Sequence, residues 1–265
     1  MAAETKSGTV LDRIIEARRA AIAHRKKSVP ETALHFGVKQ AKPVRDFAAA
    51  LTRDSLNVIS ELKKASPSRG LIRADFDPVA LAKCLEAAGA AALSVLTEEE
   101  FFQGELKYMR DARAAVDLPV LRKDFIIDPW QVWEARATDA DSFLLVVAGL
   151  GDTLLGELLA LGRELEMEPL VEVHTREELL RALAAGARII GVNNRNLRTL
   201  EVRIETSMEL IEEIPRECIA VCESGLRSHA DLARFRAAGF DAFLIGEHLM
   251  AQPDPGTALR TLLGV

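Results

Sequence analysis

The segment Ile59-Ser60-Glu61-Leu62-Lys63-Lys64-Ala65-Ser66-Pro67-Ser68-Arg69-Gly70 changes from an apolar run to a polar loop within twelve residues. Its β-branched start predicts a strand, and its proline and glycine predict the loop that follows. Side chains alternate across a strand, so Glu61 and Lys63 are predicted to project from the same face at its end. Two interpretations are open: a solvated ion pair at a sheet edge, which contributes little stability, or one wall of a polar site.

Seven further apolar runs follow this segment along the chain. Together they give eight predicted strands, at 57–62, 90–96, 119–123, 141–147, 169–173, 188–192, 218–222 and 241–245. Each is followed by a segment with helical periodicity, near 78–88, 105–116, 128–139, 152–166, 176–185, 205–213, 229–238 and 255–263. Short strands that alternate with longer helices are typical of βα units in a parallel sheet.

The predicted helix ends carry consistent signals. Ala-Ala-Gly recurs at 87–89, 184–186 and 237–239, between a helix and the next strand, where glycine adopts a left-handed conformation. Helix starts are marked by Asp77 before Pro78, by Thr175 with Glu178 as a capping box, and by Ser228 with Asp231 at its third position. We therefore predict an α/β protein with a single closed (β/α)8 TIM barrel. An open doubly wound sheet is disfavoured, because Lys-Ala-Ser-Pro-Ser stands where that fold usually has a glycine-rich turn.

Residues 1–56 differ from the rest of the chain. An amphipathic helix is predicted over 10–25, with Leu11, Ile14 and Ile22 on one side, and a second short helix over 44–51. We interpret residues 1–56 as an N-terminal helical extension packed on the barrel. The barrel itself is predicted to span residues 57–265 as one domain. We also expect the extension to cover the mouth of the barrel and to help bind substrate.

Composition excludes several classes of function. The length of 265 residues suits a (β/α)8 barrel, which typically needs ~250. A net charge of −6 without a basic stripe argues against nucleic acid as a partner. The first ten residues lack the apolar core of a signal peptide, and the longest apolar run, at 143–150, is far short of the ~18 residues of a membrane span. We expect no export and no membrane association.

Three cysteines, Cys84, Cys218 and Cys222, cannot all pair with one another. Cys218 and Cys222 lie in one predicted strand, where four residues span ~13 Å, beyond the reach of a disulfide. Reduced cysteines are typical of the cytoplasm, where we expect this protein to be located.

Polar side chains follow five of the eight predicted strands. In (β/α)8 barrels the active site lies at the carboxyl ends of the strands, so these residues are functional candidates. They are Glu61 and Lys63 after the first strand, Arg122-Lys123-Asp124 at the third, Glu172 in the fifth, Asn193-Asn194-Arg195 at the sixth, and Glu223-Ser224-Gly225 at the seventh.

Glu172 is the most informative of these candidates, because Val171 and Val173 flank it in a strand that is predicted to be buried. It is either a structural acid paired with a lysine or an acid/base group in a cleft. His174 points to the same side, although a lone histidine beyond a strand more often caps or hydrogen-bonds locally. Lys123 is either one of three solvated charges or a member of the same cluster.

Glycines follow the seventh and eighth strands, at Gly225 and Gly246, and a short extra helix is predicted over 247–250. Barrels commonly bind phosphate at these two strands, through backbone N–H groups and a helix N-terminus. The carboxylate of Glu247 must turn away from such a phosphate.

Taken together, these motifs resemble the indole-3-glycerol phosphate synthase family. The matching segments, in family order, are Glu61 to Ser68 (ELKKASPS), Ser94 to Glu98 (SVLTE) with Phe102 and Gly104, Leu121 to Phe125 (LRKDF), Pro169 to His174 (PLVEVH), Gly191 to Arg195 (GVNNR), Glu223 to Gly225 (ESG) and Leu244 to Gly246 (LIG). The resemblance covers almost the whole chain.

The resemblance implies ring closure of 1-(2-carboxyphenylamino)-1-deoxyribulose 5-phosphate to indole-3-glycerol phosphate, with loss of carbon dioxide and water. Lys123 is then the general acid at the substrate carbonyl, and Glu172 is the acid/base of the dehydration. Lys63 is its partner near the leaving hydroxyl, and Glu61 tunes both lysines. Lysines and glutamates interleaved in a low-dielectric cleft can supply such proton transfers.

The remaining site residues are carried over in the same way. Asn193, grouped with the catalytic residues, and Arg195 resemble those that hold the polar groups of the substrate. Ser66 and Phe102 resemble those around the carboxyphenyl ring, and Ser224, Gly225 and Gly246 match the phosphate cradle. No metal or cofactor is implied, the partner is a phosphorylated small molecule, and we expect a monomer or weak homo-oligomer.

Three alternatives compete with this interpretation. An isomerase on the same phosphoribosyl-anthranilate scaffold calls for a cysteine near the end of the first strand, whereas Cys84 lies in a predicted helix. A Schiff-base aldolase would use Lys63 or Lys123 as its nucleophile. A barrel that has lost its chemistry and only binds phosphate is disfavoured by the joint presence of the lysines and glutamates.

Overall fold

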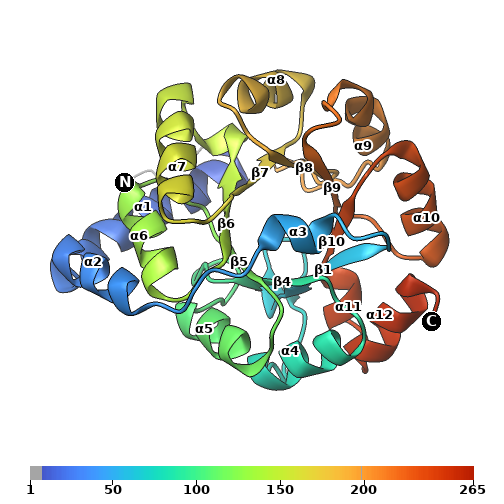
Figure 1. The fold of residues 1–265 in the computed structure, drawn as a ribbon, viewed down its shortest axis with the longest axis horizontal. Helices are drawn as coiled ribbons and strands as arrows, with labels where there is room; N and C mark the ends of the chain where they lie inside the picture. Colours follow the sequence, from blue (N-terminus) through green and yellow to red (C-terminus); the bar gives the residue numbers. More distant parts are fainter. Residues whose placement is uncertain (1–7, 198) are drawn as a thin grey trace, which may run out of the picture.

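The eight predicted strands close into one parallel barrel. The computed structural model describes residues 8–197 and 199–265, and the ring runs β1-β4-β5-β6-β7-β8-β9-β10, with β10 pairing with β1 (Figure 1). The strands are β1 Asn57–Leu62, β4 Ala92–Leu96, β5 Val120–Lys123, β6 Ser142–Val146, β7 Leu170–Val173, β8 Ile189–Asn193, β9 Ile219–Glu223 and β10 Ala242–Ile245. The predicted (β/α)8 TIM barrel is confirmed.

Strand ends differ from the predicted ones by at most two residues. Asn193 and Glu223, expected just after their strands, are the last residues of β8 and β9 and lie opposite each other in the parallel register. The short hairpin of β2 (Ala65–Ser66) and β3 (Gly70–Leu71) was not predicted, because two-residue strands carry no periodicity.

The outer helices follow the strands as predicted, and Figure 1 shows them as a ring around the barrel. They are α4 Pro78–Ala87, α5 Leu106–Ala115, α6 Pro129–Ala137, α7 Asp152–Glu164, α8 Arg176–Ala184, α9 Glu205–Leu210, α10 His229–Ala238, α11 Glu247–Met250 and α12 Pro255–Leu263, with 3-10 turns η1 Val147–Gly149 and η2 Ile211–Glu213. In the described ranges, no helix combines the length and apolarity that crossing a bilayer demands.

Most of the predicted helix signals are confirmed. Gly89, Gly186 and Gly239 have φ of 97°, 83° and 115°, and the Ser228–Asp231 capping box is complete. The box predicted at Thr175 is wrong. Thr175 accepts a hydrogen bond from the N–H of Glu178, but the Glu178 carboxylate accepts from the N–H of His174 instead of that of Thr175.

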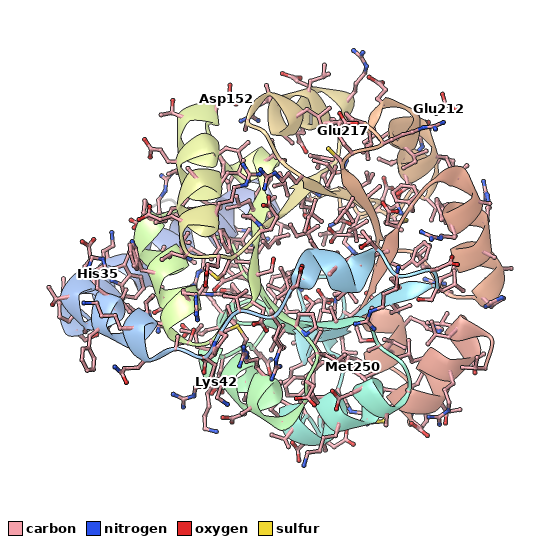
Figure 2. All side chains as sticks on the ribbon, in the orientation of Figure 1. His35, Lys42, Asp152, Glu212, Glu217 and Met250 are labelled. Atoms are coloured by element: carbon pink, nitrogen blue, oxygen red, sulfur yellow. The ribbon has the colours of Figure 1, made fainter. Side chains whose placement is uncertain are left out.

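Two apolar layers hold the barrel together. Inside it, alternate strand residues from all eight strands meet in one buried cluster: Ile59, Ala92, Leu121, Leu144, Leu170, Ile189, Val221, Ala242 and Leu244. The residues between them point outward and pack against the helices, for example Val58, Leu93 and Phe243. Charged side chains such as Asp152 and Glu212 lie at the rim of the molecule (Figure 2). Alternation of this kind is the expected pattern of a filled barrel.

Three helices precede β1: α1 (Val10–Ser28), α2 (Glu31–Gln40) and α3 (Phe47–Leu51). The predicted helix over 44–51 begins only at Phe47, because Asp46 accepts the N–H of Ala49 and caps it there. Helix α2 was not predicted, since Leu34 is its only buried residue and is covered by Trp130 of α6. Helix α3 lies over the barrel centre in Figure 1, and its Phe47 joins the inner cluster.

Asn57 links the start of β1 to the end of α3 and to the residue before β10. Its Nδ2 donates to the carbonyl oxygens of Leu51 at 2.8 Å, Arg53 at 3.0 Å and Asp241 at 3.0 Å, and the side chain is buried. Because buried carbonyls need partners, this one amide joins α3, the segment after it and the residue before β10 to the first strand.

We therefore expect Asn57→Ala to lower the free energy of unfolding by about 2–4 kcal/mol, the cost of leaving these buried carbonyls without a donor. Urea denaturation measures the difference. Ser55→Ala is the control, because it removes only the 2.9 Å bond to Asn57 Oδ1 and should cost less than about 1 kcal/mol. Equal losses in the two variants would contradict this account.

Candidate active site

A cavity of about 340 Å³ lies at the carboxyl ends of the barrel strands. The residues predicted for catalysis and substrate binding line it: Glu61, Lys63, Ser66, Phe102, Lys123, Glu172, Asn193, Arg195, Ser224, Gly225 and Gly246. The other candidates Arg122 and Asn194 are buried and do not line it. These residues come from seven of the eight barrel strands or from the loops that follow them, and they meet at the end of the barrel where active sites of this fold lie.

Lys123, the last residue of β5, lies between two glutamates. Its Nζ is 2.8 Å from Glu172 Oε2 and 3.2 Å from Glu223 Oε2, and the glutamate side chains are only 3% and 1% exposed. Burial disfavours the ammonium, but the carboxylates of Glu172, Glu223 and Glu61 outweigh it and raise the pKa of Lys123. Burial alone would raise the pKa of Glu172, but the Lys123 ammonium holds that pKa well below its usual range. This lysine is therefore charged at neutral pH.

Glu223 is the member of this cluster to which the sequence analysis gave no role. Burial, together with the nearby Glu172, raises its pKa to about 8, against the opposing effect of Lys123. Its Oε1 has no hydrogen-bond partner among the described residues, and a Cβ at Gly191 would lie 2.1 Å from that oxygen. Glycine in β8 thus makes room for the carboxyl group. The signal was present in the sequence, since Glu223 ends a buried strand as Glu172 does.

Glu61 and Lys63 form an ion pair inside the cavity. Lys63 Nζ lies 2.5 Å from Glu61 Oε2, with side chains 16% and 3% exposed. The interpretation as a solvated pair at a sheet edge is therefore wrong. A Cβ at Gly246 would lie 2.1 Å from Glu61 Oε2, so Gly246 also makes room for this carboxylate, a role that was not foreseen.

Asn193 organises the side of the cavity at β8 and β9. Its Oδ1 accepts hydrogen bonds from Ser224 Oγ at 2.9 Å and from the N–H of Arg195 at 3.0 Å, which leaves the amide nitrogen to donate to a ligand. Ser224 and Gly225 both have positive φ, of 66° and 88°. A Cβ at Gly225 would lie 2.8 Å from Val202 and Ile204 side-chain atoms, so this tight turn requires glycine.

Glu247 also lines the cavity and faces two arginines. Its Oε2 is 3.1 Å from Arg195 Nη2 and its Oε1 is 3.5 Å from Arg69 Nε. The carboxylate is therefore occupied by guanidinium groups. The short helix that was predicted over 247–250 is present as α11, with Gly246 before it.

Aromatic side chains form the apolar part of the cavity. The Phe102 and Phe125 rings lie 6.3 Å apart, and both line the cavity. The buried carboxylate of Glu98 accepts the N–H groups of Phe101 at 2.7 Å and Phe102 at 3.1 Å, which holds this loop in place. Ser66 Oγ lies 3.3 Å from Ser68 Oγ beside it.

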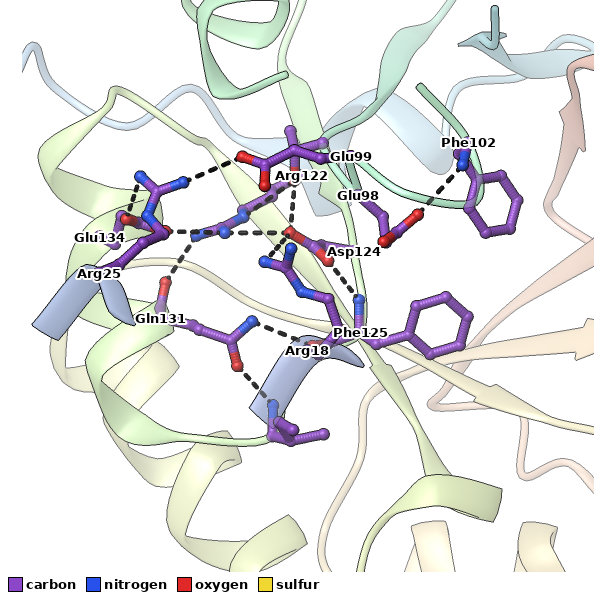
Figure 3. Close-up of polar contacts among 12 residues, drawn as sticks. Arg18, Arg25, Glu98, Glu99, Phe102, Arg122, Asp124, Phe125, Gln131 and Glu134 are labelled. Carbon is purple, nitrogen blue, oxygen red and sulfur yellow. Dashed lines mark hydrogen bonds and ion pairs between the residues drawn. The ribbon is translucent and has the colours of Figure 1, made fainter. Parts of the chain in front are cut away.

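The first helix reaches the site through buried charges, as Figure 3 shows. Arg18 of α1 donates to Asp124 Oδ2 at 3.1 Å, and both side chains are almost fully buried. The same oxygen accepts from Thr97 Oγ1 at 2.7 Å and from Arg122 Nη2 at 3.0 Å. Val10 and Ile14, earlier in α1, line the cavity itself. The sequence analysis named Ile14 only for its apolar face.

Comparison with known proteins matches this geometry to a family. The family model described as indole-3-glycerol phosphate synthase matches residues 11–262. The chain belongs to the indole-3-glycerol phosphate synthase family. An indole-3-glycerol phosphate synthase of Azospirillum brasilense is 48% identical over 96% of this chain and 98% of its own length. One of Rhodospirillum rubrum is 47% identical, over 96% of this chain and 99% of that one.

Solved structures agree on the fold alone. A 3-hexulose-6-phosphate synthase has a TM-score of 0.64 at 14% identity, covering 79% of this chain and 99% of that one. The N-acetylmannosamine-6-phosphate 2-epimerase from Clostridium perfringens has a TM-score of 0.60 at 13% identity, over 78% and 93%. The predicted activity rests on the family: the chain is an indole-3-glycerol phosphate synthase, a carboxy-lyase of tryptophan biosynthesis that acts on a phosphorylated small molecule.

None of the three cysteines lines the cavity of this indole-3-glycerol phosphate synthase. Cys84 lies in α4, as the case against the isomerase assumed, and none of the three cysteines forms a disulfide. Burial raises the pKa of the Cys222 thiol to about 12. Within residues 8–197 and 199–265, no three His, Cys, Asp or Glu side chains are placed to hold a metal ion.

The raised pKa of Glu223 predicts a pH-dependent stability difference. Its carboxyl binds a proton up to about pH 8 in the folded chain but only to about pH 4.5 when unfolded. The native state therefore binds more protons between these values, and stability is lost as the pH rises through them. Glu223→Gln removes this loss and should gain on the order of 1 kcal/mol over the wild type at pH 8, but not at pH 4.5.

Thermal unfolding at pH 4.5 and pH 8 measures this difference. Glu157→Gln, at an exposed position of α7, is the matched control and should change stability equally little at both values. A Glu223→Gln variant whose stability relative to the wild type is the same at pH 4.5 and pH 8 would show that Glu223 is not held protonated in the folded chain.

Proposed function

We propose that Lys123, Glu172 and Lys63 carry the proton transfers by which this chain cyclises 1-(2-carboxyphenylamino)-1-deoxyribulose 5-phosphate. The observation that supports this most strongly is the charged Lys123 ammonium, held in the cavity between Glu172 and Glu223. A positioned ammonium beside two carboxylates can give up a proton and be re-protonated without leaving the site.

In the proposed sequence, the ring carbon that bears the carboxylate attacks the substrate carbonyl carbon. Lys123 donates a proton to the carbonyl oxygen as this carbon–carbon bond forms. Loss of carbon dioxide restores the aromatic ring, and the hydroxyl just formed then leaves as water. Glu172 acts as acid/base in this dehydration, and Lys63 lies near the leaving hydroxyl. Glu61 lies 2.5 Å from Lys63 and raises the pKa of Lys123, which supports the role we propose for it as the residue that tunes both lysines.

The binding residues divide the cavity into two ends. At one end, Phe102 and Ser66 are proposed to hold the carboxyphenyl ring, supported by the aromatic wall that Phe102 forms with Phe125. At the other end, Ser224, Gly225 and Gly246 are proposed to bind the phosphate through N–H groups, as glycines after these two strands commonly do. Asn193 and Arg195, which also line the cavity, are proposed to hold the polar groups of the substrate.

The Schiff-base alternative requires a neutral lysine amine as nucleophile. The carboxylates around Lys123 raise its pKa instead of lowering it, which disfavours that role. Borohydride with a keto-phosphate substrate would trap an adduct only in an aldolase.

Lys123→Ala is expected to lower turnover by ~10²- to 10⁴-fold, the usual contribution of a general acid, with substrate binding retained. Indole fluorescence measures product formation, and titration with substrate measures binding. Lys83→Ala, at an exposed position of α4, is the control and should keep full activity. Retained turnover in Lys123→Ala would refute its assignment as general acid.

We also propose that residues 1–56, of which 1–7 lie outside the described residues, act as an extension of the barrel domain, 57–265, and close over the substrate. The support is the position of Val10 and Ile14 on the cavity wall and the buried bond between Arg18 and Asp124, the residue after Lys123. Rigid attachment at this point places the α1 side chains over the bound substrate.

Arg18→Met should therefore raise KM about fivefold or more while kcat changes less, because breaking a buried pair loosens α1 without touching Lys123. Asp124 keeps Arg122 and Thr97 as partners, so the barrel itself remains intact. Steady-state kinetics measures both constants. Arg19→Met, an exposed neighbour on the same helix, is the control. If KM were the same in both variants, α1 would have no part in binding.

Location and assembly are part of the same proposal. We propose a cytoplasmic protein, a monomer or weak homo-oligomer, that needs no nucleic acid partner. Three cysteines without a disulfide support the reducing location. Light scattering across a range of protein concentrations tests the assembly, and a mass that stays constant at twice or more that of one chain would contradict it.

A further inference from the structure

His174 lies directly behind Glu172, outside the cavity. It follows β7, and its ring is 10% exposed between two carboxylates: Nε2 is 3.3 Å from Glu172 Oε1, and Nδ1 is 3.2 Å from Glu178 Oε2. Glu178 also accepts the backbone N–H of His174 at 2.7 Å, so the first turn of α8 holds the ring in place. Because His174 does not line the cavity, it can act on the reaction only through Glu172.

The two glutamates that share Lys123 differ in their other partners. Glu172 has a second cationic partner in His174, so each of its oxygens faces one positive group. Glu223 has only Lys123, at the longer distance of 3.2 Å, and its buried Oε1 is unpartnered in the described part of the chain. Two carboxylates against one ammonium favour one bound proton, and these contacts place it on Glu223.

We propose that His174 is a positioning residue that, as an imidazolium, keeps Glu172 ionised and assigns the proton of the glutamate pair to Glu223. This rests on the proposed role of Glu172 as acid/base of the dehydration. An ionised Glu172 can accept a proton from the substrate, and the adjacent imidazolium makes it release that proton again. The ring lies 3.3 Å from Oε1, on the side of Glu172 away from Oε2, which faces Lys123.

Charges on every neighbouring element agree with this assignment. Burial alone would lower the pKa of His174, but Glu172 and Glu178 raise it to about 10. Around Glu172 itself, the structure places Lys123 of β5 and Glu223 of β9, and the Glu61 carboxylate of β1 acts on both of these groups. The imidazolium therefore persists through the range of pH in which the enzyme can be assayed.

Nuclear magnetic resonance of ¹⁵N-labelled histidine rings tests the charge without relying on activity. The wild type contains five histidines, and the signal that disappears in His174→Gln belongs to His174. That signal should show no titration below pH 8 in the wild type, and its midpoint should fall by about one pH unit in Glu178→Gln, which removes one of the two carboxylates. A midpoint between pH 6 and 7 in the wild type would overturn the proposal.

The kinetic arm compares His174→Gln with His35→Gln, whose ring lies at the outer edge of the molecule on α2 (Figure 2). We expect kcat of His174→Gln to fall about tenfold, with KM within twofold, and an ionisation in its pH–rate profile to move upward, because the cluster loses a positive charge. His35→Gln should match the wild type. A kcat and pH profile in His174→Gln equal to those of the wild type would also overturn the proposal.

These outcomes are separable from the proposed function. If wild-type protein formed no indole product while His174 stayed charged, the catalytic assignment would fail and the assignment of charge to His174 would stand. If His174→Gln did not fold, Glu178→Gln would carry both measurements, with a smaller change in the same direction. An unchanged histidine midpoint and an unchanged pH profile in Glu178→Gln would then refute the positioning role.

Discussion

The site depends on one buried lysine shared between two glutamates. Lys123 lies 2.8 Å from Glu172 and 3.2 Å from Glu223, in surroundings from which bulk water is largely excluded. A buried charge without a partner is strongly unfavourable, whereas buried charges that compensate each other are tolerated. Lys123 lowers the pKa of both glutamates, and both glutamates raise the pKa of Lys123. The remaining polar residues are arranged around this constraint.

The barrel accommodates these carboxylates by omitting side chains beside them. Gly191 of β8 leaves space for Glu223, and Gly246 after β10 leaves space for Glu61; a Cβ at either position would lie 2.1 Å from a carboxylate oxygen. The strand register also positions the site residues, because it places Asn193 opposite Glu223. The Asn193 amide oxygen then accepts a hydrogen bond from Ser224, in the turn after β9. Gly246 therefore has two roles: it makes room for the Glu61 carboxylate, and it belongs to the proposed phosphate cradle.

Further charges beside the three central groups extend the arrangement in two directions. Toward the first helix, Asp124 accepts from Arg18, Arg122 and Thr97, which connects α1 to the residue next to Lys123. Toward α8, His174 lies between Glu172 and Glu178. Each group meets charges of opposite sign, so the low dielectric of the interior strengthens their attraction and limits the geometries open to them.

The sequence by itself determined the class of fold and the members of the site. Eight alternating runs with caps such as Ser228 and glycines such as Gly89 are local signals, and local signals survive without knowledge of the packing. The residues predicted for catalysis and substrate binding line one cavity, because the active site of such a barrel lies at the carboxyl ends of its strands. Side chains alternate across a strand, so the neighbouring Arg122 and Asn194 do not line it, and His174 lies outside it as well. Helix α2 was missed because its burial depends on the distant Trp130. The hairpin of β2 and β3 was missed because two-residue strands carry no periodicity.

Only the tertiary structure decided which charges meet. Glu61 and Lys63 could equally have formed a surface pair, and no spacing in the sequence joins Glu223 to Lys123, 100 residues apart, or Arg18 to Asp124, 106 residues apart. The state of each ionisable group follows from such contacts: Glu172 and Glu223 both end or nearly end buried strands, yet their pKa values move in opposite directions. Burial and distance set these values, and both quantities exist only once the barrel has closed.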